Sequence, residues 1–161
     1  MPRPPATARW VAALVAAVVR LGAAGCGPQP NDLAPASCLV TNRDYLRALE
    51  RAPGGVRLAS DTAISACLVP EQQAGQLASI GHEMIIAATK LNVEARHDPG
   101  GPAAVQLGYL IGAVAKGADP IHTDLVRRLN SAARFSETGG TLPASFERAF
   151  GRGYAAGHSS G

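Results

Sequence analysis

The sequence predicts an all-α protein, a small bundle of four to five helices that follows an apolar amino-terminal segment and a proline-rich linker. Apolar residues recur at i, i+3 and i+4 spacing in several stretches after residue 40, which indicates amphipathic helices. Pro-Gly clusters separate these stretches and predict short connections between the helices. Because aromatic residues make up only 4% of the chain, Ala, Leu, Ile and Val must supply the core.

The first 27 residues have the organisation of a secretory signal. Arg3 and Arg9 give a positive start, and the apolar run over residues 10–19 is too short for a stable transmembrane helix. The run Leu21-Gly22-Ala23-Ala24-Gly25-Cys26 follows, with small residues where a signal peptidase needs them. Residues 1–27 therefore resemble the signal peptide and lipobox of bacterial lipoproteins.

This resemblance implies that residues 1–25 are a signal peptide removed by cleavage and that Cys26 then carries lipid. Residues 26–37 contain three prolines and little apolar content, so we expect a lipid-anchored flexible linker. The membrane is thus an expected partner. The expected location is extracytoplasmic, at the outer face of the cytoplasmic membrane or at another envelope membrane. Ordinary secretory cleavage at the same small residues, giving a freely secreted domain, is the alternative.

The cysteine count agrees with a lipid anchor. A secreted chain with three cysteines has one left over, and lipid on Cys26 leaves Cys38 and Cys67 as an even pair. We expect a disulfide between these two in an oxidising compartment. Closing that loop would stabilise the fold by about 3.5 kcal/mol in the chain-entropy model. Two free thiols are the alternative, because connectivity cannot be deduced from sequence alone.

The charge of the mature chain is balanced. Three of the fifteen basic residues, Arg3, Arg9 and Arg20, lie in the removable segment. The remaining chain contains twelve Lys and Arg residues and twelve Asp and Glu residues. A basic pI ordinarily suggests nucleic acid as a partner, and here that suggestion disappears with the signal. We expect no nucleic-acid binding.

A short helix is expected first in the mature domain, capped by a side chain among residues 41–44 and ended by the Pro-Gly-Gly cluster at 53–55. Residues 56–69 alternate weakly between apolar and polar. They predict a loop or a small hairpin that contains Cys67.

The longest expected helix starts at Pro70, with Glu71 favourable near its positive end, and runs to about Arg96. It carries two apolar stripes on roughly opposite sides, and such a helix is usually central in a bundle or covered by a partner. The first stripe comprises Leu77, Ile80, Met84, Ala88, Leu91 and Ala95. The second, weaker stripe comprises His82, Ile86, Thr89 and Val93.

The next helix, over residues 103–116, has an apolar face and a face of small residues. The small face carries Ala104, Gly108 and Gly112 at four-residue spacing, which lets another helix approach closely. We expect close packing inside the bundle at this face. We also retain Gly108 and Gly112 as candidates for a contact surface.

Two further helices complete the predicted bundle, whose helical domain spans residues 38–157. The first of them starts near Asp119-Pro120, carries the stripe Ile121, Leu125, Leu129 and Ala132, and is broken at residues 138–140. The last opens near Pro143 and frays through its glycines, so that residues 158–161 form a disordered tail.

Motifs for catalysis are absent from the sequence, which has no GxSxG, P-loop, HExxH or strand-linked GxGxxG pattern. His82-Glu83 begins like a zinc-protease helix, but Ile86 occupies the position of the second His. Glu94 and His97 form a Glu-x-x-His motif once, whereas di-metal bundles need it twice. We therefore assign no catalytic residue, no metal and no cofactor.

The leading hypothesis is a non-enzymatic envelope module that binds a protein partner or an apolar small molecule. Its candidate surface combines the second stripe of the long helix with the small face of the next, that is His82, Ile86, Thr89, Val93, Gly108 and Gly112. The alternative is a haem- or metal-binding helical bundle that uses His82 and His122. A small hydrolase with a Ser beside one of these histidines is a third hypothesis.

Overall fold

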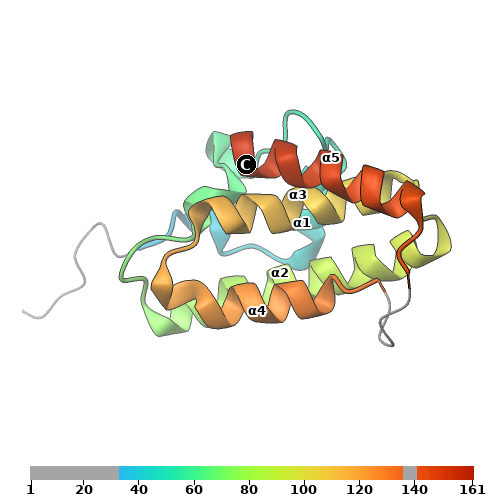
Figure 1. Ribbon diagram of the computed structural model, residues 1–161. Helices are drawn as coiled ribbons and strands as arrows, with labels where there is room; N and C mark the ends of the chain where they lie inside the picture. The colour runs from blue at the N-terminus through green and yellow to red at the C-terminus, as the bar shows by residue number, and fades with distance from the viewer. Residues whose placement is uncertain (1–32, 136–140) are drawn as a thin grey trace, which may run out of the picture.

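The computed structural model describes residues 33–135 and 141–161, and its fold is all-α (Figure 1). Within these ranges α-helices are joined by loops and short 3₁₀ turns, and no strand is present. The predicted small helical bundle is confirmed. The helices are α1 (Asn42–Leu49), α2 (Ala74–His97), α3 (Pro102–Gly117), α4 (Thr123–Ala132) and α5 (Ala144–Ser160). The 3₁₀ turns are η2 (Ala36–Cys38), η3 (Ala59–Asp61), η4 (Ile64–Cys67) and η5 (Pro120–His122).

The helices pack in pairs around one core. Figure 1 shows α5 lying along α3 and α4 lying along α2, and α1 also packs against α2. The first stripe of α2 faces the core as predicted, because all its members after Leu77 are buried. Leucines of α3, Tyr45 of α1 and Leu129 of α4 add further buried side chains. The core is therefore built mainly from aliphatic residues of the central helices.

The packed domain begins before Cys38. Ala34 is buried, and its N–H donates a hydrogen bond to Oε1 of Gln76 at 3.0 Å. The prediction of a flexible linker up to residue 37 was therefore wrong for its last residues, because α2 offers them a partner. The signal segment, Cys26 and the predicted helix break at 138–140 lie outside the described residues.

The predicted disulfide is present. Cys38 and Cys67 are bonded, their Cα atoms lie 5.5 Å apart, and both are fully buried. The bond joins η2 to η4, so the segment before α1 is attached to the loop before α2. That loop contains two 3₁₀ turns in place of the hairpin that was one of its predicted forms.

Helix α2 begins at Ala74, later than the predicted start at Pro70. Glu71 lies outside the helix and adopts φ of 58°, so the predicted contact with the positive helix end does not form. The reason is Gln72, which is buried and donates from Nε2 to the carbonyl oxygen of Cys67 at 3.1 Å. The turn brings this side chain to the disulfide instead of continuing the helix.

The predicted close packing of the small face of α3 is confirmed, and α5 occupies that face. A Cβ added at Gly108 would lie 2.1 Å from the carbonyl oxygen of Phe150, and one at Gly153 would lie 1.9 Å from that of Val105. Glycine is required where two helix backbones approach this closely. Since Gly108 and Gly112 are buried under α5, the hypothesis that they form a surface for a partner was wrong.

Helix α5 continues to Ser160, so the predictions of fraying at its glycines and of a disordered tail over 158–161 were wrong. Its glycines Gly153 and Gly157 are buried against α3. Its last turn is held by Arg57, which donates to the carbonyl oxygen of Ser160 at 3.0 Å, and by Lys116. Basic side chains also suit the negative end of a helix.

At the start of α4 one stripe residue was assigned wrongly. Ile121 is 45% exposed, and the neighbouring His122 is fully buried instead. Both residues belong to η5, where three residues make a turn and side-chain directions differ from those of an α-helix. Leu125 and Leu129 are buried as predicted.

Candidate functional site

The second stripe of α2, here called the outer face of α2, consists of His82, Ile86, Thr89 and Val93. His82 and Thr89 are exposed, Ile86 is partly buried, and Val93 is 52% exposed. The opposite side of the same helix is in the core. The described residues therefore leave this face uncovered, including one large aliphatic side chain.

Two hollows flank the outer face of α2. On the α1 side, Leu39, Val40, Ile80 and His82 help to line a hollow of about 440 Å³. On the α4 side, Thr89, Asn92, Val93 and Arg96 help to line a hollow of about 370 Å³. The exposed side chain of Leu39 adds apolar surface beside the first hollow. The surface is thus a ridge between two depressions, a relief that suits contact with another protein.

Glu83 connects the α1 side of this ridge to α1 itself. Its Oε2 accepts hydrogen bonds from the backbone N and from Nδ2 of Asn42, at 2.7 and 2.8 Å. These bonds hold the pKa of the Glu83 carboxyl below its ordinary value. Lys90 donates to Oδ1 of the same asparagine at 2.7 Å. Glu83 thus links α2 to the start of α1 through Asn42.

Asn92 connects the other side of the ridge to the end of α4. Its Nδ2 donates to the carbonyl oxygens of Ala132 and Arg134, at 2.9 and 2.7 Å. These carbonyls lie at the carboxyl end of α4, where helix geometry supplies no donor. Asn92 therefore fixes the end of α4 to α2 through polar contacts.

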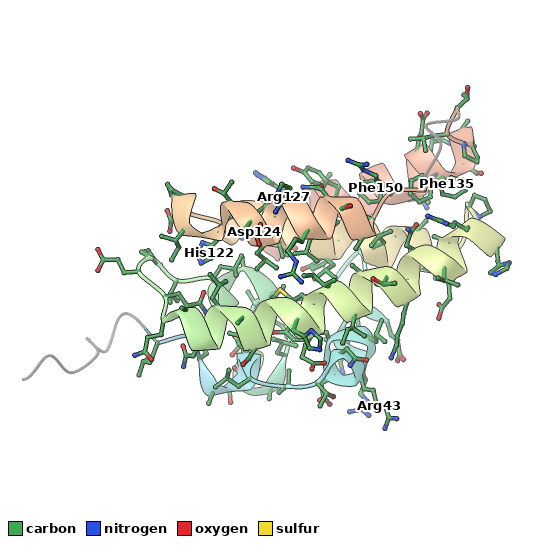
Figure 2. All side chains as sticks on the ribbon, turned by 90° about the horizontal axis from the view of Figure 1, so that it is seen from below. Arg43, His122, Asp124, Arg127, Phe135 and Phe150 are labelled. Carbon is green, nitrogen blue, oxygen red and sulfur yellow. A yellow bond between two sulfur atoms is a disulfide. The ribbon has the colours of Figure 1, made fainter. Side chains whose placement is uncertain are left out.

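His122 is fully buried at the start of α4, and Figure 2 labels its position. The backbone N–H of Asp119 donates to Nδ1 at 2.9 Å, which assigns the ring proton to Nε2. Nε2 then donates to Oε1 of Gln72 at 3.1 Å. Burial lowers the pKa of His122 below its ordinary value of 6.5, against the opposing effect of the Asp119 carboxylate.

The two hydrogen bonds of His122 leave neither ring nitrogen with a lone pair for a metal. Among residues 33–135 and 141–161, no group of three or more His, Cys, Asp and Glu could hold a metal ion. His122 is therefore occupied by hydrogen bonds within the described residues. The ring partners of His122 are Asp119 and Gln72, and not the serine that the hydrolase hypothesis requires.

The disulfide belongs to the same buried network as His122. Tyr45 donates its hydroxyl proton to the carbonyl oxygen of Cys38 at 2.9 Å. Gln72 donates from Nε2 to the carbonyl oxygen of Cys67. Burial raises the pKa of Tyr45 far above its ordinary value, so the phenol keeps the proton that it donates. The polar groups of this network form hydrogen bonds with one another, so they stabilise the fold.

A group of arginines near α1 was not singled out from the sequence. Arg43, Arg47 and Arg51 follow at four-residue spacing, a signal that the sequence already contained. Two of them line a hollow together with Arg57. In Figure 2, Arg43 on α1 and Arg127 on α4 lie to opposite sides of α2.

In the part of the chain that the structure describes, no helix combines the length and the apolar character needed to cross a membrane. Comparison with protein-family models, with curated proteins and with solved structures finds no match to this chain.

Proposed function

We propose that this chain is an exported, lipid-anchored envelope protein whose helical domain binds a protein partner without catalysing a reaction. The observation that carries the proposal is the buried disulfide between Cys38 and Cys67. Disulfides persist in oxidising compartments and are rare where thiols are kept reduced. The bond leaves Cys26 as the odd cysteine of three, the residue on which the lipoprotein resemblance places the lipid.

The outer face of α2 is the proposed contact surface. Val93 on this face is 52% exposed, and Leu39, which lines the adjoining hollow, is 50% exposed. Exposed aliphatic side chains interspersed with polar ones such as Thr89 and His82 provide both apolar contact and hydrogen-bonding groups for a protein partner. The surrounding helices are held by internal bonds, so the face is presented by a fixed scaffold.

The anchor is tested by membrane fractionation. Cys26→Ser removes the thiol that would carry the lipid, so we expect the variant to leave the membrane fraction. The parent should have the mass of residues 26–161 plus acyl groups, less the two hydrogens of one disulfide. Unchanged membrane retention of Cys26→Ser, or a parent mass without acyl groups, would contradict the anchor.

The contact surface is tested by photo-crosslinking in intact cells. A photoreactive phenylalanine analogue replaces Thr89 on α2 in one variant and the exposed Ala155 on α5 in a matched control. We expect a discrete crosslinked adduct from position 89 and none of the same size from position 155. Identical adduct patterns, or none from position 89, would remove the outer face of α2 as a partner site.

A further inference from the structure

A hollow of about 230 Å³ lies between α1 and the segment that follows Val56, apart from the outer face of α2. Arg47, Arg51 and Arg57 line it, together with the hydroxyl-bearing Ser37 and the carboxylate of Asp44. Three guanidinium groups at one small hollow stand out in a mature chain whose charges balance overall.

Two of the three guanidinium groups are already held in place. Arg47 forms an ion pair with Asp44, with 3.3 Å between Nη1 and Oδ1. Asp44 itself accepts hydrogen bonds from the backbone N and the hydroxyl of Thr41 at the start of α1. The carboxylate therefore serves the helix cap and also occupies one N–H donor of Arg47, whose other N–H groups can serve a ligand.

Arg57 is held mainly by the backbone. Its Nη1 donates to the carbonyl oxygens of Val56 and Ser160, at 2.8 and 3.0 Å, and its Nε lies 3.6 Å from Oδ1 of Asp61. Its Nη2 makes none of these contacts. A guanidinium fixed in advance loses less conformational entropy when it binds an anion.

Arg51, the third guanidinium, forms no ion pair with any of the described residues. It lies in the turn that follows α1, four residues after Arg47, and both side chains line the same hollow. The hollow thus brings together Arg47 and Arg57, which have internal contacts, and Arg51, which forms no ion pair among residues 33–135 and 141–161.

We propose that this hollow binds a phosphate group, either of inorganic phosphate or of a lipid headgroup. The planar fork of arginine matches the oxygen atoms of phosphate and bonds them in pairs. A volume of about 230 Å³ accommodates a phosphate group with part of its ester substituent. Ser37 also lines the hollow, and its hydroxyl is held by a hydrogen bond of 2.7 Å with that of Thr62.

The position of the hollow along the chain places lipid phosphates within its reach if Cys26 is acylated. Ser37 lines the hollow and follows Cys26 by eleven residues, which span at most about 40 Å when fully extended. The phosphate site itself depends on the arginines alone, so it does not require the proposed anchor.

Asp44 provides an internal check on the proposal, since its carboxylate lines the same hollow and repels an anion. Asp44→Asn removes that charge but keeps an oxygen that can accept from the backbone N of Thr41. If phosphate binds here, this variant binds it more tightly than the parent. If phosphate binds elsewhere, the substitution has no such effect.

The experiment is a titration of the purified protein with inorganic phosphate, followed through the amide NMR signals of Ala48 and Ala59, which line the hollow. We expect saturable shifts at both amides. Arg47→Gln with Arg51→Gln should weaken binding by about tenfold or more, since charge-assisted hydrogen bonds are lost. Asp44→Asn should strengthen binding by about threefold.

The matched control is Arg127→Gln with Arg128→Gln on α4. Arg127 pairs with Asp124 three residues earlier, as Arg47 pairs with Asp44, and its side chain is equally exposed at 75%. This control removes the same charge, so it should change the affinity less than about twofold. Equal losses of affinity in both double variants would mean that phosphate is attracted by charge alone, and this would overturn the site. Absent or unsaturable shifts of the two amide signals would also overturn it.

The source of the phosphate is resolved by a second titration with dihexanoyl phosphatidylglycerol below its micelle concentration. Tighter binding than that of inorganic phosphate at the same two amides assigns the site to membrane lipid. Saturable binding of inorganic phosphate alone assigns it to a free phosphate. Binding of neither probe overturns the proposal. Melting temperatures of all variants, expected to match the parent closely, show that they are folded.

Discussion

Two helices of this protein, α5 and α4, each cover a central helix, but they are attached in different ways. On α3, the backbone of α5 makes direct contact through glycines on both helices, and a Cβ at any of four of them would collide with backbone. On α2, the corresponding glycine is Gly81, and a Cβ there would meet only the side-chain end of Leu125, at 2.9 Å. The first contact is set by backbone shape and the second by side chains.

Polar bonds supplement the looser contact of α4. Asn92 holds the carboxyl end of α4, and His122 with Gln72 holds its amino end. Between these points Leu125 and Leu129 supply the buried apolar contacts. This difference shows how one bundle combines a sterically fixed helix pair with a pair fastened by hydrogen bonds. Because α4 covers only one flank of α2, the outer face of α2 stays open.

The largest expected effect comes from the α3–α5 contact. Gly153→Ala would place a methyl group 1.9 Å from the carbonyl oxygen of Val105, so the two backbones must separate. We expect the free energy of unfolding to fall by about 3 kcal/mol, measured by urea denaturation. The control is Gly151→Ala in the same helix, where a Cβ meets nothing within 4 Å. That substitution should stabilise the protein by up to about 1 kcal/mol, and similar losses in both variants would contradict the steric interpretation.

A smaller effect is expected where Asn92 fastens α4. Asn92→Ala removes both hydrogen bonds to the carbonyls of Ala132 and Arg134, and we expect a loss of about 2 kcal/mol in unfolding free energy. Asn130→Ala is the control, because Asn130 is exposed and bonds only within α4, to the carbonyl of Val126. Its effect should stay within about 0.5 kcal/mol. If the two variants behave alike, the α4 contact does not depend on this bridge.

The smallest effect concerns pH and the amino end of α4. Burial lowers the pKa of His122 in the folded protein below the value of 6.5 that it has when unfolded, so the unfolded chain binds more protons below pH 6.5. Stability from this group is therefore complete above about pH 6.5 and declines as the pH falls through the folded pKa. Unfolding measured across this range should show the decline in the parent and a flatter profile in His122→Gln. An equally steep decline in His122→Gln would contradict this role of His122.

Much of the fold could be predicted because its signals are local. Helical spacing of Ile80, Met84 and Leu91 identified the core side of α2, and the clusters at 53–55 and 98–102 marked helix ends. The errors arose where a distant residue decides the local geometry. Gln72 leaves the predicted helix to reach Cys67 and His122, and Gly153 was interpreted as a weak point although α3 lies against it.

The candidate sites divide in the same way. Periodicity placed His82, Ile86, Thr89 and Val93 on one face, but only the packing showed that this face is uncovered while Gly108 and Gly112 are enclosed. Both faces look alike as stripes in a sequence. Which one a neighbouring helix covers depends on contacts between residues some 45 positions apart, such as Gly108 and Phe150, and no local pattern records them.

By itself, the sequence predicted the helical class and the core side of α2, because the helical period acts within short segments. The cysteine count favoured a disulfide between Cys38 and Cys67, and the structure contains that bond. The tertiary structure decided that α5 packs backbone to backbone against α3, that His122 is a buried donor and acceptor, and that Arg57 lies at one hollow with Arg47 and Arg51. These properties arise only when segments distant in the chain meet, because steric fit, burial and the convergence of charges depend on spatial neighbours.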